Sequence, residues 1–182
     1  MDGKEMKLDK TWIPLEKISP NMILAVVASE DNRFTDHWGF DFDAIEKASK
    51  YNETNRKHKV KGASTISQQT AKNVFLLPVR SWIRKGFEVY FTGLIELCWS
   101  KKRIMEVYLN IIEMGDGVYG VEAASQKYFR KHAKDISNGE AAMIAAVLPN
   151  PRKWFPNQPN GYLLRRQVWI MWNMNNIGKV EF

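Results

Sequence analysis

The feature that most constrains the fold of this chain is a long run of apolar residues with helical spacing. From Ser81 to about Ile112 apolar side chains recur every three or four positions. The basic stretch after Ser100 interrupts this run, so it predicts two helices. Strand patterns are nearly absent, which predicts a mainly α fold. Further helices are expected over Met22–Ser29, Asp41–Tyr51, Val121–Phe129, Ser137–Leu148 and Leu163–Asn175, with another beginning at Gly62-Ala-Ser64.

Length and charge narrow the class of protein. With 182 residues, 45% of them hydrophobic, the chain is expected to form one globular domain over residues 1–182. The net charge of +7 favours an anionic partner, which leaves nucleic acid, an acidic membrane surface and a phosphorylated substrate open. Cys98 is the single cysteine, so no internal disulfide is possible, and its apolar surroundings predict burial. No apolar window reaches the roughly 18 residues that span a bilayer.

The first candidate for chemistry is a carboxylate at a helix end. Ser19-Pro20 predicts a helix start, and the helix is expected to end near Asp31. Glu30 then lies at the negative end of the helix dipole, which disfavours its charge. A carboxylate with raised proton affinity is suited to general-base catalysis. The alternative is a solvent-exposed carboxylate with no chemical role.

Two further segments carry polar residues close together in the sequence. In the helix that begins near Gly62, Ser64 is expected to be the cap, and Gln68 and Lys72 lie one turn apart on a shared face. Glu88 follows Arg84 by four positions. Taken separately, these patterns fit a polar helix face and a surface ion pair equally well.

Other motifs point away from common classes. The segment Gly115–Gly120 matches the dinucleotide fingerprint G-x-G-x-x-G, but a helical pattern precedes it where a strand is required. These glycines are therefore interpreted as a tight turn that allows a close helix approach. The three histidines lack metal-binding spacing, and His37 is interpreted as a structural residue. No S-x-x-K occurs, which excludes a penicillin-binding acyl-enzyme centre.

Taken together and in order, the motifs carry a specific resemblance. From about Ile18 to Arg166 the chain resembles the peptidoglycan glycosyltransferases of family 51, of the monofunctional biosynthetic transglycosylase type. Ala63 departs from the family pattern, which commonly has a second glycine there. The shared motifs are Glu30-Asp-x-x-Phe-x-x-His-x-Gly39, Gly62-x-Ser-Thr-Ile-x-Gln-Gln-x-Ala-Lys-Asn73, Arg80-Ser-Trp-x-Arg-Lys-x-x-Glu88, Glu106-Val-Tyr-Leu-Asn110, Gly115-x-Gly-x-x-Gly-x-x-x-Ala124-x-x-x-Tyr-Phe129 and Ala141–Pro151.

The resemblance implies a fold, an activity and a location. The fold would be a lysozyme-like α-rich lobe with a small membrane-facing lobe. The activity would be polymerisation of lipid II into glycan strands, by inverting transfer from an undecaprenyl-pyrophosphate donor to the acceptor 4-hydroxyl. The domain would work at the bacterial cytoplasmic (inner) membrane, on its periplasmic or outer face. The family's monofunctional members carry an N-terminal transmembrane anchor, and this chain is expected to be a form without it.

The resemblance also implies roles for individual residues. Glu30 would be the base, and Glu88 would assist at the pyrophosphate. Asp31 would orient the site. Some family members use a divalent cation, Mg²⁺ or Mn²⁺, although this sequence shows no ligand cluster. The residues expected to bind sugar or pyrophosphate are Ser64, Gln68, Gln69, Lys72, Asn73, Arg80, Arg84 and Lys85.

Expected partners are lipid II, the growing glycan chain, the membrane surface and other cell-wall synthesis proteins, with no nucleic acid. Two rival functions remain. A lysozyme-like hydrolase would cut glycan and would not need the cationic residues between Lys72 and Lys85. A basic nucleic-acid-binding module would show steeply salt-dependent binding and no lipid requirement.

Overall fold

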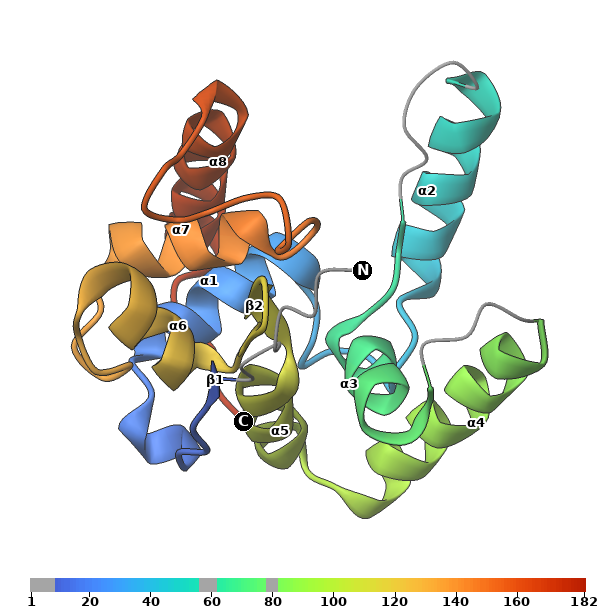
Figure 1. Cartoon of the computed structure of the whole chain (residues 1–182). Coiled ribbons are helices and arrows are strands. Elements are labelled where there is room, and N and C mark those ends of the chain that lie inside the picture. Colours follow the sequence, from blue (N-terminus) through green and yellow to red (C-terminus); the bar gives the residue numbers. More distant parts are fainter. Residues whose placement is uncertain (1–8, 56–61, 78–81) are drawn as a thin grey trace, which may run out of the picture.

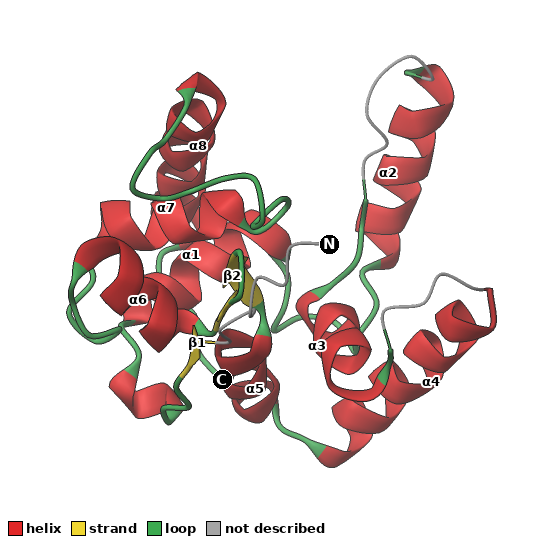
Figure 2. Cartoon of the chain, viewed as in Figure 1, coloured by secondary structure: helices red, strands yellow, loops and turns green. Residues whose placement is uncertain are grey.

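A computed structural model of the chain describes residues 9–55, 62–77 and 82–182. Within these residues it has eight α-helices, one 3₁₀ turn at Leu15–Lys17 and three short strands, so the mainly α prediction is confirmed (Figure 2). The helices are α1 (Pro20–Glu30), α2 (Phe42–Thr54), α3 (Ile66–Phe75), α4 (Trp82–Cys98), α5 (Lys101–Ile111), α6 (Val121–Phe129), α7 (Asn138–Val147) and α8 (Gly161–Ile177). The strands are β1 (Asp9–Lys10), β2 (Glu113–Gly115) and β3 (Val118–Tyr119).

Helix starts follow their capping residues. Ser19 caps α1 through a hydrogen bond that its hydroxyl accepts from the Asn21 amide, and Pro20 takes the first helical position. The interruption near Ser100 is also confirmed, because its side chain caps α5. The expectation that Ser64 caps α3 is wrong. Thr65 caps it, in a reciprocal capping box with Gln68, which satisfies two backbone donors at once.

The small sheet was not predicted from the sequence. β2 and β3 form an antiparallel hairpin, β1 pairs parallel to β3, and the strand order is β1-β3-β2. The glycine motif provides the turn, as expected. Gly120 has a φ of +83°, and a Cβ there would lie 2.8 Å from the carbonyl oxygen of Asn110. Strands of two or three residues are too short to show an alternating pattern.

The main core lies among α1, α5, α6, α7 and α8. α1 packs against both α7 and α8, and the whole run Ala141–Val147 of α7 is buried. α3 and α4 pack together beside this core and form a smaller lobe, while α2 extends away on the same side (Figure 1). The fold therefore separates a well-packed lobe that carries α1 from a thinner one that carries α4.

The smaller lobe exposes much of its apolar surface. Trp82 is 93% exposed and Leu97 is 78% exposed, although both lie on a helix with apolar periodicity. Cys98 is also exposed, so the prediction of its burial is wrong. Periodicity locates the apolar face of a helix but does not say whether protein covers that face. Within the described residues, no helix is long and apolar enough to cross a membrane.

Candidate active site

Glu30 lies in the wall of a large cleft. As the last residue of α1 it borders a cavity of about 880 Å³ and a neighbouring one of about 370 Å³. The larger cavity lies between α2 and α8, above the start of α3. Its lining residues are Ser29, Glu30, Tyr51, Gly62, Ala63, Ser64, Gln69, Pro149, Tyr162, Arg165, Arg166 and Trp169. Of the predicted site residues, the structure thus brings Glu30, Ser64 and Gln69 together.

The carboxylate of Glu30 is held on both oxygens. Oε1 accepts a hydrogen bond from the Ser29 hydroxyl at 2.9 Å, and Oε2 accepts one from the Gln69 amide at 3.2 Å. Arg166 places its Nη2 3.5 Å from Oε1. The Glu30 side chain is 14% exposed, so it is fixed in orientation and still reaches the cavity.

Arg166 is a site residue that the sequence reasoning missed. It comes from α8, donates to the Ser29 hydroxyl at 3.0 Å and lies over the ring of Trp169 at 5.8 Å from the centroid. Arg165 and Tyr162 of the same helix also line the cleft. The available signal was the pair Arg165-Arg166 within a helix of apolar spacing, which places two cations beside an otherwise apolar face.

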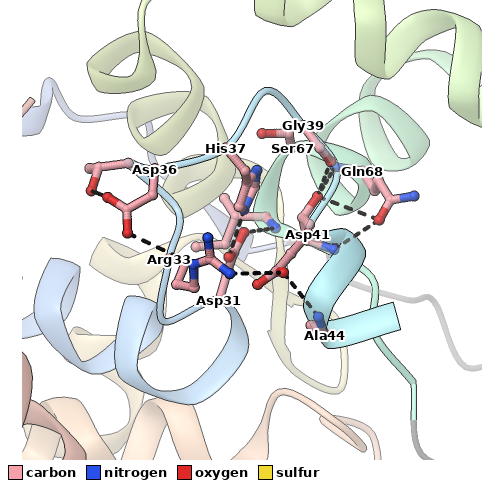
Figure 3. Close-up of polar contacts among 12 residues, drawn as sticks. Asp31, Arg33, Asp36, His37, Gly39, Asp41, Ala44, Ser67 and Gln68 are labelled. Carbon is pink, nitrogen blue, oxygen red and sulfur yellow. Dashed lines mark hydrogen bonds and ion pairs between the residues drawn. The ribbon is translucent and has the colours of Figure 1, made fainter. Parts of the chain in front are cut away.

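Asp31 organises the loop that follows Glu30 in the chain, as its contacts in Figure 3 show. It is buried, accepts a hydrogen bond from the backbone amide of Ile66 at 3.0 Å, and pairs with Nε2 of His37 at 2.9 Å. These contacts join the end of α1 to the start of α3. The structural interpretation of His37 is confirmed by this buried pair, and the orienting role of Asp31 stays a prediction.

The polar residues of α3 and of the segment just before it divide between the cleft and the interior. Ser64 lines both cavities. Gln68 is buried, and its side-chain oxygen accepts from the Thr65 amide at 3.0 Å. Gln68 thus has a structural role in the capping box and is not among the residues that line the two cavities, while its expected binding role stays a prediction. Lys72 is half-buried, and Asn73 is exposed.

The second carboxylate lies on the smaller lobe. Glu88 of α4 is buried, and one of its oxygens accepts from Nζ of Lys85 at 2.6 Å. Neither Glu88 nor Lys85 is among the described residues that line the two cavities beside Glu30, so their part in the site stays a prediction. Arg84 lies in the first turns of the same helix, and Arg80 lies outside the described residues.

A third buried carboxylate connects the two lobes. Glu96 of α4 accepts hydrogen bonds from Ser67 and from Lys101, the latter at 2.7 Å. The loop that follows Glu30 packs closely against the same helix, since a Cβ at Gly39 would lie 2.7 Å from a methyl carbon of Thr92. The position of α4 is thereby coupled to the loop that carries Asp31.

Within the described residues, no group of three or more His, Cys, Asp or Glu side chains could hold a metal ion. The divalent cation that the sequence resemblance suggested therefore finds no dedicated protein cage there. A cation bound chiefly by substrate phosphates would not need one, because Mg²⁺ is commonly held by one or two carboxylates and phosphate oxygens.

Comparison with known proteins shows the family of this chain. The family profile described as "Transglycosylase" matches residues 3–175, which is most of the chain. The chain belongs to the transglycosylase family. The matched range includes all the residues that line the two cavities.

Two relatives show how close the likeness is. A biosynthetic peptidoglycan transglycosylase of Bdellovibrio bacteriovorus is 61% identical over 164 residues, covering 90% of this chain and 65% of its own length. One from Yersinia pseudotuberculosis is 56% identical over 171 residues, covering 94% of this chain and 70% of its own. The chain thus spans about two thirds of the length of these transglycosylases.

Proposed function

We propose that this chain is a peptidoglycan glycosyltransferase that polymerises lipid II into glycan strands by inverting transfer. The observation that carries the proposal is Glu30, held on both oxygens at the wall of a cleft large enough for sugar units. The family match and the names of the relatives support the same reaction. Activity of the transglycosylase type requires a base beside the acceptor sugar, and the position of Glu30 in the wall of the cleft supports that role for it.

The chemistry follows from inversion. An inverting transfer needs one group to remove the proton of the attacking hydroxyl and others to stabilise the leaving group. Glu30 would take the proton of the acceptor 4-hydroxyl as that oxygen attacks the anomeric carbon of the donor. The pyrophosphate leaves with its electron pair, and Lys72, Arg84 and Lys85 supply positive charge where its negative charge grows. Glu88 would hold Lys85 toward that charge through their ion pair.

The two sides of the cleft, formed by α2 and α8, would receive sugar units. Tyr51, Tyr162 and Trp169 bring aromatic side chains to the cleft, and Arg165 and Arg166 bring cations. Ligand sites are commonly apolar and aromatic, with a few polar groups that fix orientation. The proposed binding residues therefore include side chains of α2 and α8, two helices that were not predicted to take part.

The direct test is incubation of the protein with labelled lipid II in detergent or vesicles, followed by gel separation of the products. We expect long glycan strands from lipid II, and none from a substrate that lacks the undecaprenyl-pyrophosphate carrier. The same protein should release no sugars from finished, undecaprenyl-free glycan. Release of short sugars from finished glycan without use of lipid II would establish the hydrolase in place of the proposed function.

We also propose that the smaller lobe contacts the membrane that contains lipid II. Aromatic rings cluster there, with Phe75 stacked on Phe91 at 4.7 Å between centroids. Large apolar side chains cover its outer surface, and these are Val74, Phe75, Leu77, Trp82, Ile83, Phe87, Val89, Tyr90 and Leu97. Shallow apolar insertion and the net charge of +7 would act together on an anionic membrane.

Flotation with anionic vesicles tests this contact. The double substitution Trp82→Ser and Leu97→Ser should lower the bound fraction roughly tenfold, because two large apolar side chains lose their burial in lipid. High salt should weaken binding of the wild type as well. Val168→Ser with Trp172→Ser on α8 is the matched control, since both residues are similarly exposed. Equal loss in the two variants would refute a contact specific to the smaller lobe.

A further inference from the structure

A buried tyrosine lies behind the proposed base. Tyr108 of α5 is completely buried, and its hydroxyl donates to Oε1 of Gln69 at 3.2 Å. Gln69 in turn donates from Nε2 to Oε2 of Glu30 at 3.2 Å. A continuous hydrogen-bonded line therefore runs from the core to the base through one amide side chain.

The direction of this line follows from the chemistry of its neighbours. Nε2 of Gln69 faces two groups that can only accept, the carboxylate of Glu30 and the carbonyl oxygen of Ser64 at 3.4 Å. The NH₂ group must therefore be on that side, and the amide oxygen must face Tyr108. Because an amide oxygen only accepts, the Tyr108 hydroxyl is the donor.

Tyr108 keeps this donor over a wide pH range. Burial raises its pKa well above the usual value, and the negative charges of Glu30 and Asp31 raise it further. The phenol remains protonated where the enzyme works, so it supplies a constant donor to the amide. A buried hydroxyl that only donates is well suited to fix the orientation of the amide beside it.

We propose that Tyr108 is a positioning residue for the transfer reaction, which holds the Gln69 amide so that its NH₂ group faces Glu30. This inference rests on the proposed function, in which Glu30 is the base. Without the Tyr108 hydroxyl the amide oxygen loses its donor, and the side chain can rotate away from Glu30. Oε2 of Glu30 then loses the Nε2 donor, which makes the ionised form that accepts the proton less favourable.

The other groups around Glu30 are unchanged by this rotation. Arg166 approaches Glu30 from α8, and Asp31 follows it in the chain. The remaining charged residues that line the two cavities beside it are Arg33, Asp41, Asp43, Lys47 and Arg165. Within the described part of the chain, none of them makes a hydrogen bond or ion pair with Gln69. The hydrogen bonds from Tyr108 to Gln69 and from Gln69 to Glu30 therefore form the link between the two residues.

The pH dependence of kcat for lipid II polymerisation tests the proposal. Tyr108→Phe should lower kcat roughly threefold to tenfold on the acid limb, the range expected for one lost hydrogen bond. The acid limb should move to higher pH by about half a unit to one unit, and the difference should close on the plateau. KM should stay within about twofold. Damage to the fold would lower kcat at every pH.

Tyr128→Phe is the matched control. Tyr128 is also buried, and its hydroxyl has no hydrogen-bond partner among the described residues, so this change should leave the profile as in the wild type. If the wild type polymerises lipid II and Tyr108→Phe keeps the wild-type acid limb, the positioning role of Tyr108 is refuted and the proposed function stands. A wild type that makes no glycan would overturn the proposed function instead.

A double variant adds an independent criterion. If Tyr108 acts through Gln69, then Gln69→Ala with Tyr108→Phe should be no slower than Gln69→Ala alone. Additive losses would contradict the proposal. If Tyr108→Phe does not fold, the wild type still decides: the side-chain amide signals of Gln69, followed by NMR with ¹⁵N-labelled glutamine, should shift with the acid limb. Signals that stay constant through that range would refute it.

Discussion

Replacing Glu30 with glutamine should reduce lipid II polymerisation by about a hundredfold or more while the fold is retained. General-base groups contribute roughly 10²- to 10⁴-fold to a reaction, and an amide cannot accept the hydroxyl proton. The substitution keeps the size of the side chain, so the contacts of α1 with α7 and α8 should remain. The measurement is the initial rate of glycan formation from labelled lipid II, with circular dichroism to check the helices.

Glu46→Gln provides the control for charge, because Glu46 pairs with Lys50 on the exposed face of α2. Its rate should equal that of the wild type, since surface pairs of this kind stabilise by less than about 1 kcal/mol. If Glu30→Gln retained more than about a tenth of the wild-type rate, a different group would have to take the proton.

Replacing Asp31 with alanine should destabilise the protein by about 2–5 kcal/mol. The change leaves the buried Ile66 amide and Nε2 of His37 without their acceptor, and each buried unpaired group costs about 1–3 kcal/mol. Nδ1 of His37 already lacks a partner among the described residues, so the ring cannot compensate on its other side. We expect the midpoint of thermal unfolding to fall by roughly 5–15 °C.

The comparison for this variant is Asp36→Ala. Asp36 lies in the same loop, but its side chain is 61% exposed, so its removal should change the unfolding midpoint by little. The two proteins would be compared by differential scanning calorimetry under the same conditions. Unfolding midpoints that agree within about 2 °C would show that Asp31 does not join α1 to α3 as its contacts indicate.

The helical architecture was largely predictable because its signals are local. Ser19 caps α1 as predicted, and Ser100 and Ser137, which lie where helix boundaries were expected, cap α5 and α7. α6 has the predicted bounds, Val121–Phe129. The cap of α3 was misplaced by one residue, since Ser64 and Thr65 are both good capping residues and the tertiary position of the chain chooses between them. The short sheet depends on pairing between distant segments, which no local pattern records.

The site was predictable only where its residues lie within motifs. Glu30, Ser64 and Gln69 were expected and do meet at the cleft. Arg166 and Tyr108 were not expected to take part, because their roles arise from the packing of α8 against α1 and of α5 against α3. Burial was the other quantity that sequence could not give. Gln68 turned out to face the interior and Cys98 to face solvent, although both lie on helices whose position was expected.

The contact between the end of α1 and α8 also sets an order of assembly. Ser29 and Arg166 are 137 positions apart, so a ribosome that adds 5–20 residues per second makes the second on the order of ten seconds after the first. During that interval the nascent chain carries Glu30 without the cation beside it or the wall that holds Trp169. Glu30 therefore enters its finished surroundings only when α8 docks.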